Sequence, residues 1–292
     1  MGLVVASIRK AVPPGWQRAG RRVYVGVGRR TSQYRVLPDF ILIGGQRCGT
    51  TSLFRALMQH EDVVRPTFHK GVNYFDTNYF RGSDWYAGHF PLRSVANYRS
   101  RHLPPRVFEA SGYYMFHPLA LRRLSEDMPG VKLVAMLRDP VERAYSAWKH
   151  ESARGFEWED FETALRLEDE RLMGEVDRIH LDPTYESFCH RHHSYRGRGE
   201  YADLLDSALT YFPRAQLHIM YSEDLFERPE ETFGALSAFL ELAPQREIAF
   251  DRYNARPRQP MGERARHNLT EHFECRTGRL TEIVGAPPPW GY

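Results

Sequence analysis

The sequence has 292 residues, of which 42% are hydrophobic and 26% are charged, and this composition is typical of a globular protein with a substantial core. No stretch approaches the roughly 20 apolar residues that cross a bilayer, and the first apolar run, residues 3–8, is too short for a signal peptide. Three widely spaced cysteines argue against a disulfide framework or a sulfur-rich zinc site. We therefore expect a cytoplasmic protein, and the scarcity of lysine relative to arginine favours a GC-rich, bacterial genome.

The charge is unevenly distributed along the chain. Eight basic residues and no acidic residue precede Asp39, whereas acidic residues outnumber basic ones in the remainder. We interpret residues 1–37 as a basic N-terminal arm and residues 38–292 as one domain. The arm either contacts an anionic membrane surface or a polyanionic partner or, more simply, is a solvated extension. Because no nucleic-acid-binding motif accompanies the charge, we do not expect a nucleic-acid partner.

Apolar runs and helical patterns alternate from Asp39 onward without an internal repeat, which predicts an α/β domain with a parallel sheet. Short apolar runs predict strands at residues 40–44, 107–110, 132–137 and 216–221. Amphipathic segments with capping signals predict helices at residues 50–60, 118–127, 140–154, 161–172, 201–212, 230–240 and 263–274. Ligands of such a sheet bind at the carboxyl ends of its strands.

Glycine and hydroxyl residues follow the first predicted strand. The segment GGQRCGTTS, from Gly44 to Ser52, leads into an amphipathic helix, so amides and hydroxyls converge at the positive end of that helix. The segment nearly matches the Walker A pattern GxxxxGK[ST], but Thr50 stands at the lysine position and the cation, Arg47, comes earlier. We interpret it as an anion-binding loop, with a plain strand-to-helix turn as the alternative.

A second motif follows the strand predicted at residues 132–137. Arg138 comes first, where a nucleoside triphosphatase would have an acidic magnesium ligand, and Ser146 lies eight residues further on, about two helical turns. A cation and a hydroxyl that reach one point suit a second phosphate group and not a metal ion. The alternative is that Arg138 forms a salt bridge with Asp139 or Glu142 at the helix start.

These two motifs resemble those of the sulfotransferases that use 3′-phosphoadenosine 5′-phosphosulfate (PAPS), in particular the bacterial and heparan-sulfate-type carbohydrate branch. DFILIGGQRCGTTSLFRAL is similar to the family's 5′-phosphosulfate loop, and LVAMLRDPVERAYSAW is similar to its 3′-phosphate motif. VFEASGYYMFHP, RGEYADLL and QLHIMYSEDL resemble later family segments, so the resemblance covers residues 38 to about 290.

The resemblance implies a P-loop-like sulfotransferase fold, a three-layer arrangement in which helices flank a parallel sheet. It also implies transfer of a sulfuryl group from PAPS to a hydroxyl of a carbohydrate, glycolipid or small-metabolite acceptor. Adenosine 3′,5′-bisphosphate (PAP) would be released, and no metal ion would be required.

The resemblance also assigns nucleotide-binding residues. The 5′-phosphosulfate would be held by Arg47, Cys48, Gly49, Thr50, Thr51 and Ser52, and the 3′-phosphate by Arg138 and Ser146. Arg198 would close over the nucleotide. Arg47 replaces the family's usual lysine and cannot give up a proton, so its catalytic role would be electrostatic stabilisation of the bridging oxygen. Cys48 is either a thiol with a lowered pKa or simply a small residue that lets the loop close.

The acceptor side departs from the family pattern. The family's KExHFFD-like segment corresponds to KGVNYFD, in which Gly71 replaces the glutamate that acts as general base and Asn73 replaces the histidine. Ala110 stands where the family's EKS segment has lysine, so of this acceptor-side set Asp76 alone is retained.

Three residues are candidates for the missing base. If residues 67–73 are extended, His69 lies on the same face as residue 71 and Lys70 turns away, and a histidine is suited to accept a proton near neutrality. Glu109, at the end of the next predicted strand, is the second candidate and Asp76 is the third. Exposed loop placement is the alternative for His69.

Two other functions are compatible with the motifs. A P-loop kinase acting on a small molecule would use ATP and magnesium, but Thr50 at the lysine position and Arg138 in place of a strand-end acid argue against it. A nucleotide-binding homologue without catalytic activity is suggested by Gly71, which has no side chain to act as a base.

Overall fold

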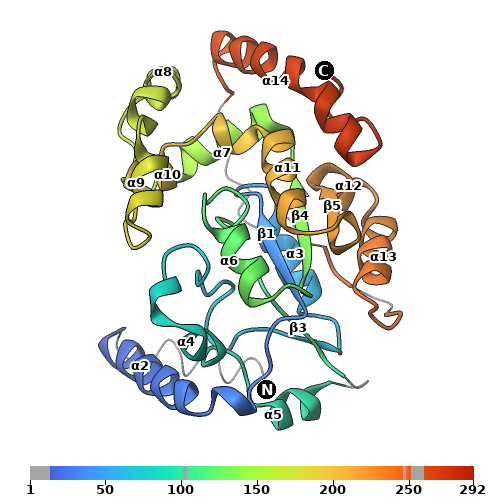
Figure 1. Ribbon diagram of the computed structural model, residues 1–292. Helices are drawn as coiled ribbons and strands as arrows, with labels where there is room; N and C mark the ends of the chain where they lie inside the picture. Colours follow the sequence, from blue (N-terminus) through green and yellow to red (C-terminus); the bar gives the residue numbers. More distant parts are fainter. Residues whose placement is uncertain (1–13, 101–103, 246–247, 251–259) are drawn as a thin grey trace.

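The computed structural model describes residues 14–100, 104–245, 248–250 and 260–292 (Figure 1). Within these residues, strands of one parallel sheet follow the order β2-β3-β1-β4-β5. Their bounds are β1 Phe40–Gly44, β2 Val63–Val64, β3 Arg106–Glu109, β4 Lys132–Leu137 and β5 Leu217–Tyr221. Because β1 lies at the centre of the sheet, the loop that follows it lies beside the ends of both β3 and β4.

Helices cover both faces of this sheet. Ile41, Ile43 and Leu133 belong to a buried cluster with side chains of α6 (Ala120–Asp127) and α11 (Tyr201–Tyr211). Alternate strand residues, among them Leu42 and Val134, pack on the other face against α3 (Thr50–Leu57), α12 (Ser222–Glu227) and α13 (Pro229–Phe239). This three-layer α/β arrangement confirms the predicted fold class.

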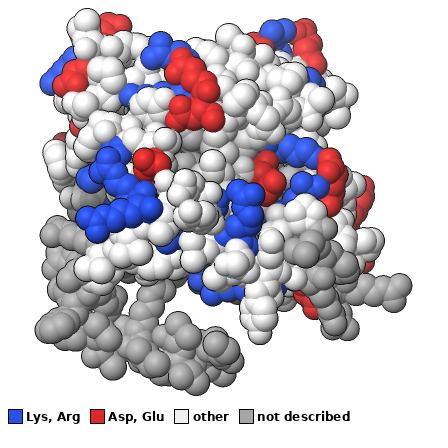
Figure 2. Space-filling model, turned by 60° about the horizontal axis from the view of Figure 1, so that its bottom comes forward, with Lys and Arg blue, Asp and Glu red and all other residues white. Residues whose placement is uncertain are grey.

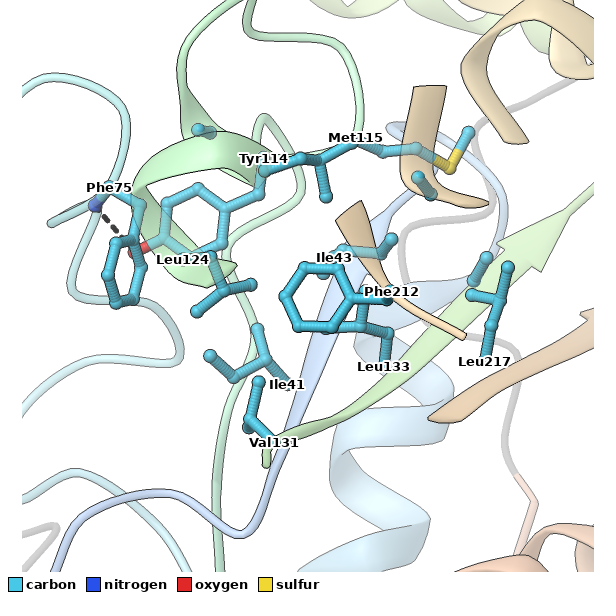
Figure 3. Close-up of a cluster of buried hydrophobic side chains, with 14 of the residues drawn as sticks. Ile41, Ile43, Phe75, Tyr114, Met115, Leu124, Val131, Leu133, Phe212 and Leu217 are labelled. Atoms are coloured by element: carbon cyan, nitrogen blue, oxygen red, sulfur yellow. Dashed lines mark hydrogen bonds between the residues drawn. The ribbon is translucent and has the colours of Figure 1, made fainter. Parts of the chain in front are cut away.

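Figure 3 shows the first of these clusters, with Leu124 and Phe212 beside the strand residues. The chain after β2 joins the same core through Phe75, whose amide donates a 3.4 Å hydrogen bond to the Tyr114 hydroxyl. The amide of Tyr74 donates to the same oxygen at 2.8 Å. The segment that carries the acceptor-side residues is thus fixed to the core by its backbone.

The helices between β4 and α11, together with the C-terminal helix, lie toward the carboxyl ends of the strands, at the upper end of Figure 1. The helix α7 (Pro140–Ser152) begins after Asp139, whose Oδ1 accepts a 2.8 Å hydrogen bond from the amide of Val141. A third buried cluster joins α7 to α8 (Phe161–Leu172) and α14 (Glu263–Val284). Two short helices, α9 (Glu175–Leu181) and α10 (Phe188–His192), follow α8.

The four predicted strands and seven predicted helices are all present. The strand β3 begins and ends one residue earlier than expected, β5 begins one residue later, and α3 ends three residues earlier. The predicted C-terminal helix is too short, because α14 continues to Val284 and ends before Gly285, which has φ 86°. The strand β2 was not predicted, since two residues are too few to show a periodic pattern.

Most of the described part of the basic arm forms a helix that packs on the domain. This helix, α2 (Pro14–Arg30), lies against α4 (Ser83–Ala87), and α5 (Arg93–Arg99) follows α4 in the chain. The Tyr24 hydroxyl is 3.0 Å from Thr67 Oγ1, and a Cβ added to Gly28 would lie 2.5 Å from the Gly88 carbonyl oxygen. The interpretation as a solvated extension is therefore wrong for this segment. Among the described residues, no helix combines the length and apolar character that spanning a bilayer requires.

Candidate functional site

The loop between β1 and α3 is folded tightly over the end of β4. The amide of Gly45 donates to the Met136 carbonyl at 2.7 Å, and the amide of Cys48 donates to the Gly45 carbonyl at 3.3 Å. Arg47 (φ 68°) and Gly49 (φ 87°) both adopt the left-handed conformation, which is uncommon for a residue such as arginine. Such a turn at the start of a helix directs backbone amides toward one point, and this arrangement favours an anion.

Lys70 adds a positive charge to this loop. Its Nζ donates to Thr50 Oγ1 at 2.8 Å and lies 3.5 Å from Thr51 Oγ1. Burial lowers the pKa of the Lys70 ammonium to about 7. Within the part of the chain that the structure describes, Lys70 pairs with no carboxylate. A partly buried cation whose partners are hydroxyls is costly by itself, and a bound anion would compensate that cost.

Sequence reasoning missed Lys70 because residues 67–73 are not extended. The chain bends at residues 67, 68 and 70, and Asn73 has φ 53°. A Cβ added to Gly71 would lie 2.5 Å from Ser111 Oγ and 2.6 Å from the Ala110 carbonyl oxygen. Position 71 therefore packs against the chain that follows β3. The face that His69 was expected to share with residue 71 is covered by this packing and is not open to an acceptor. The signal that would have found Lys70 was the lysine that opens KGVNYFD, which matches the first residue of the family's KExHFFD-like segment.

The two anion motifs are in direct contact. Arg47 Nε donates to Ser146 Oγ at 3.1 Å, and Arg138 Nη1 donates to the Arg47 carbonyl oxygen at 3.3 Å. Glu142 Oε2 is 3.9 Å from Arg138 Nη2, whereas Glu142 Oε1 is only 2.7 Å from Arg266 Nη2. The salt bridge between Arg138 and Glu142 is therefore only a loose contact. The Arg138 guanidinium lies within reach of the loop after β1 as well as of its own motif.

Two tyrosines that the sequence analysis did not single out hold this arrangement. The Tyr201 hydroxyl donates to the Arg138 carbonyl oxygen at 2.8 Å and is 3.6 Å from Cys48 Sγ. The Tyr292 hydroxyl donates to Asp139 Oδ1 at 2.8 Å, so the residue that caps α7 is fixed by the C-terminal segment. Burial raises the pKa of the Cys48 thiol. A lowered pKa for Cys48 is therefore wrong, and the buried side chain serves as a small residue under the loop.

Arg143 is a further cation that the sequence analysis did not identify. Its side chain is fully buried, and Nη2 donates to the Tyr195 carbonyl oxygen. Nε and Nη1 have no hydrogen-bond partner among the described residues. The Arg143 charge acts on both Cys48 and Tyr201 by lowering their pKa values against the larger effect of burial. It therefore adds positive potential on the protein side of the anion loop.

The three candidate bases do not occupy one place. Glu109 is fully buried, its Oε2 accepts a 3.1 Å hydrogen bond from the amide of Val72, and burial raises its pKa to about 7. Asp76 is also buried, its Oδ1 accepts a 2.6 Å hydrogen bond from the amide of Thr77, and burial raises its pKa to about 6. His69 is exposed. Of the three, it is the side chain that solvent reaches without a rearrangement of the core.

Arg198 lies in an aromatic cluster. Its guanidinium carbon is 4.8 Å from the centre of the Tyr113 ring and 4.7 Å from that of Phe116, and Nη2 donates to the Arg191 carbonyl oxygen at 2.8 Å. Burial lowers the pKa of Arg198 to about 10. Contact with a nucleotide would require this side chain to leave its present partners, so closure over the nucleotide stays a prediction.

A family model described as the sulfotransferase domain matches residues 37–261. This chain belongs to the sulfotransferase family. A solved sulfotransferase from Alicyclobacillus acidocaldarius is similar in structure, with a TM-score of 0.64 and 26% identity, and the match covers 87% of this chain and 98% of that one. The family and the similar structure confirm the sulfotransferase fold and decide against the kinase alternative.

Curated relatives of this sulfotransferase are longer proteins. The bifunctional heparan sulfate N-deacetylase/N-sulfotransferase of Drosophila melanogaster is 30% identical over 231 residues, which are 74% of this chain and 20% of the relative. The membrane-associated sulfotransferase kil1 of Dictyostelium discoideum is 24% identical over 320 residues, which are 87% of this chain and 66% of the relative. This chain thus spans about a fifth of the first relative.

Proposed function

We propose that this sulfotransferase moves the sulfuryl group of PAPS to a hydroxyl of a carbohydrate, glycolipid or small-metabolite acceptor and releases PAP. The contact between the two anion motifs, from Arg47 to Ser146 and from Arg138 to the Arg47 carbonyl, carries the proposal. A nucleotide with phosphate groups on both sides of its ribose requires two linked anion sites. Relatives named for heparan sulfate support a carbohydrate acceptor, and the cysteine pattern favours a cytoplasmic location.

The residues at the loop fit the 5′-phosphosulfate in charge and in hydrogen-bond donors. The bound nucleotide supplies an activated sulfuryl group. In the transfer, the acceptor oxygen forms a bond to sulfur, the bond from sulfur to the bridging oxygen breaks, and its electron pair stays on the 5′-phosphate. Arg47 and Lys70 would stabilise the negative charge that develops there, so no metal ion is part of the proposal. Arg138 and Ser146 would hold the 3′-phosphate.

The acceptor hydroxyl must also lose a proton. We assign this proton to His69, because it is exposed and adjacent to Lys70, whereas Glu109 is engaged with the Val72 amide inside the core. The close packing of Gly71 on Ala110 means that the missing glutamate leaves no gap in the site. The family match favours an enzyme over a homologue without activity.

Thermal unfolding with added nucleotides tests the nucleotide assignment. PAP without metal should raise the melting temperature, and ATP with magnesium should do much less. The variant Arg138→Ala should lose most of the PAP effect, whereas the control Arg228→Ala, which removes exposed ion pairs at α12 and α13, should keep it. Equal stabilisation by ATP with magnesium would contradict the proposal.

Transfer from PAPS to a panel of oligosaccharides, with PAP release as the readout, tests the reaction and its base. His69→Ala should lower turnover by roughly 100-fold or more while PAP affinity is retained. Near-normal turnover in His69→Ala together with a large loss in Glu109→Ala or Asp76→Ala would move the role of base to that carboxylate.

A further inference from the structure

The helix α2 packs on the domain with one face and leaves a neighbouring face uncovered. Tyr24 and Gly28 contact the domain. Val23 and Val27, one turn apart, are 67% and 53% exposed, and Arg30 follows on the same face and is also exposed. Exposed valines on a helix that is otherwise anchored contribute nothing to the core of this domain.

The surface beside α2 continues the same pattern. The bridge between Arg35 and Leu92 brings the chain after α2 next to the start of α5. Tyr34, which is 61% exposed, and Arg93 line a surface hollow of about 650 Å³ here. Further along α5, Tyr98 is 91% exposed. Figure 1 shows α2 and α5 along the lower end of the molecule, and Figure 2, which turns that end forward, shows patches of Lys and Arg side chains.

We define the membrane face by the shared property of its members, which are exposed apolar, aromatic or cationic side chains at this end: Val23, Val27, Arg29, Arg30, Tyr34, Arg93, Tyr98 and Arg99. The last turn of α2 carries two arginines, and no acidic residue precedes Asp39 in the sequence. Cations beside exposed aliphatic and tyrosine side chains are typical of surfaces that lie in a bilayer interface.

We infer that the membrane face docks this protein on an anionic lipid bilayer. The arginines complement the negative surface charge, and the valines and tyrosines enter the interfacial layer. A soluble polyanion would use the arginines but has no use for the valines. The strand β1 starts at Phe40, just after this face, and ends at Gly44, so the anion loop lies at the far end of the sheet. Docking thus leaves the candidate nucleotide site open to solvent, and the inference is independent of the proposed function.

Co-sedimentation of the full chain with vesicles tests this inference. The protein should bind vesicles that mix phosphatidylcholine with phosphatidylglycerol and not vesicles of phosphatidylcholine alone, and added salt should weaken binding. Replacing both Arg29 and Arg30 by Gln should weaken binding roughly 30-fold. Val23→Asp together with Val27→Asp should weaken it about tenfold or more. The matched control is Leu181→Asp on α9, since Leu181 is 85% exposed and lies outside this face.

Circular dichroism and thermal unfolding of each variant show that the fold is retained. Absence of binding to the anionic vesicles at low salt would overturn the inference. Binding that depends on the arginines but is unchanged by the valine substitutions, and that a soluble sulfated polysaccharide abolishes, would also overturn it and would assign the surface to a polyanion.

Discussion

Replacement of Lys70 by methionine should make the protein without nucleotide more stable and its complex with PAP weaker. Methionine retains most of the length of the lysine side chain and removes the charge. Burial lowers the pKa of Lys70 from its ordinary 10.5 to about 7, a difference that corresponds to about 5 kcal/mol. Lys70 is still partly exposed, and the variant lacks the hydrogen bond to Thr50. We therefore expect Lys70→Met to gain less than half of this free energy of unfolding, roughly 2 kcal/mol.

The stability gained by Lys70→Met should depend on pH in a defined direction. Between pH 7 and 10.5 the unfolded chain binds a proton at Lys70 that the folded chain does not, so the stability of the wild type rises with pH over this window. The advantage of Lys70→Met should therefore be complete below pH 7 and disappear toward pH 10.5. Chemical denaturation at pH 6 and at pH 9.5 measures both values.

Nucleotide binding should reverse the order of stability. Loss of one charge-assisted contact of about 1.5–3 kcal/mol lowers the affinity for PAP roughly 10- to 150-fold, so PAP should stabilise the wild type more than Lys70→Met. The control is Lys132→Met, which removes a 2.8 Å ion pair with Glu241 and should not stabilise the protein. If Lys70→Met is no more stable than the wild type at pH 6 and binds PAP normally, the assignment of Lys70 to the anion site is wrong.

Four further results are expected. In the wild type, PAP affinity should fall as pH rises above 7, because binding requires protonated Lys70, and titration calorimetry should show a flat profile for Lys70→Met. Arg138→Ala should weaken PAP roughly 10- to 150-fold and adenosine 5′-monophosphate far less in the same assay; equal losses would refute the 3′-phosphate role. Gly71→Ala should cost about 1–3 kcal/mol in denaturant unfolding, because its Cβ would meet the Ala110 carbonyl at 2.6 Å. Tyr201→Phe removes the hydrogen bond to the Arg138 carbonyl, so unfolding should cost about 1 kcal/mol less and PAP binding should weaken; an unchanged PAP affinity would show that this tyrosine does not set the geometry of the site.

The sheet and the proximity of the two motifs could be predicted because their signals are local. The strands Phe40–Gly44 and Lys132–Leu137 are continuous apolar runs, and both are buried along almost their whole length. Neighbouring parallel strands bring their carboxyl ends together, so Arg47 and Arg138 were expected near one ligand before any contact between them was known. Their contact through Ser146 and the Arg47 carbonyl agrees with that expectation.

The orientation of Lys70 could not be predicted, because distant contacts determine it. The amide of Ala110 donates to the Lys70 carbonyl oxygen at 2.9 Å, and this bond fixes the bent segment against the end of β3. An alternating pattern read from the sequence assumes a straight strand and has no access to such a contact. The directions of Lys70 and residue 71 consequently differ from those expected of an extended chain.

The helix α2 was missed for a different reason. Its sequence PGWQRAGRRVYVGVGRR contains four glycines, which weaken a helix by about 1 kcal/mol each relative to alanine. Gly28 lies where the backbone of α2 approaches Gly88, so a residue that lowers the local helix propensity allows the contact that holds the helix in place. Tertiary packing outweighs the local preference here.

The hydrogen bond from Tyr292 to Asp139 has a practical consequence for how this protein is produced. The Tyr292 hydroxyl holds the Asp139 carboxylate that caps α7, and Arg138 directly precedes Asp139. A recombinant version that stops at residue 261, where the match to the family ends, would lack both α14 and this tyrosine. An affinity tag fused directly after Tyr292 would place extra residues beside this hydrogen bond. A tag placed before α2 leaves that hydrogen bond intact, and work with vesicles requires that such a tag can be cleaved.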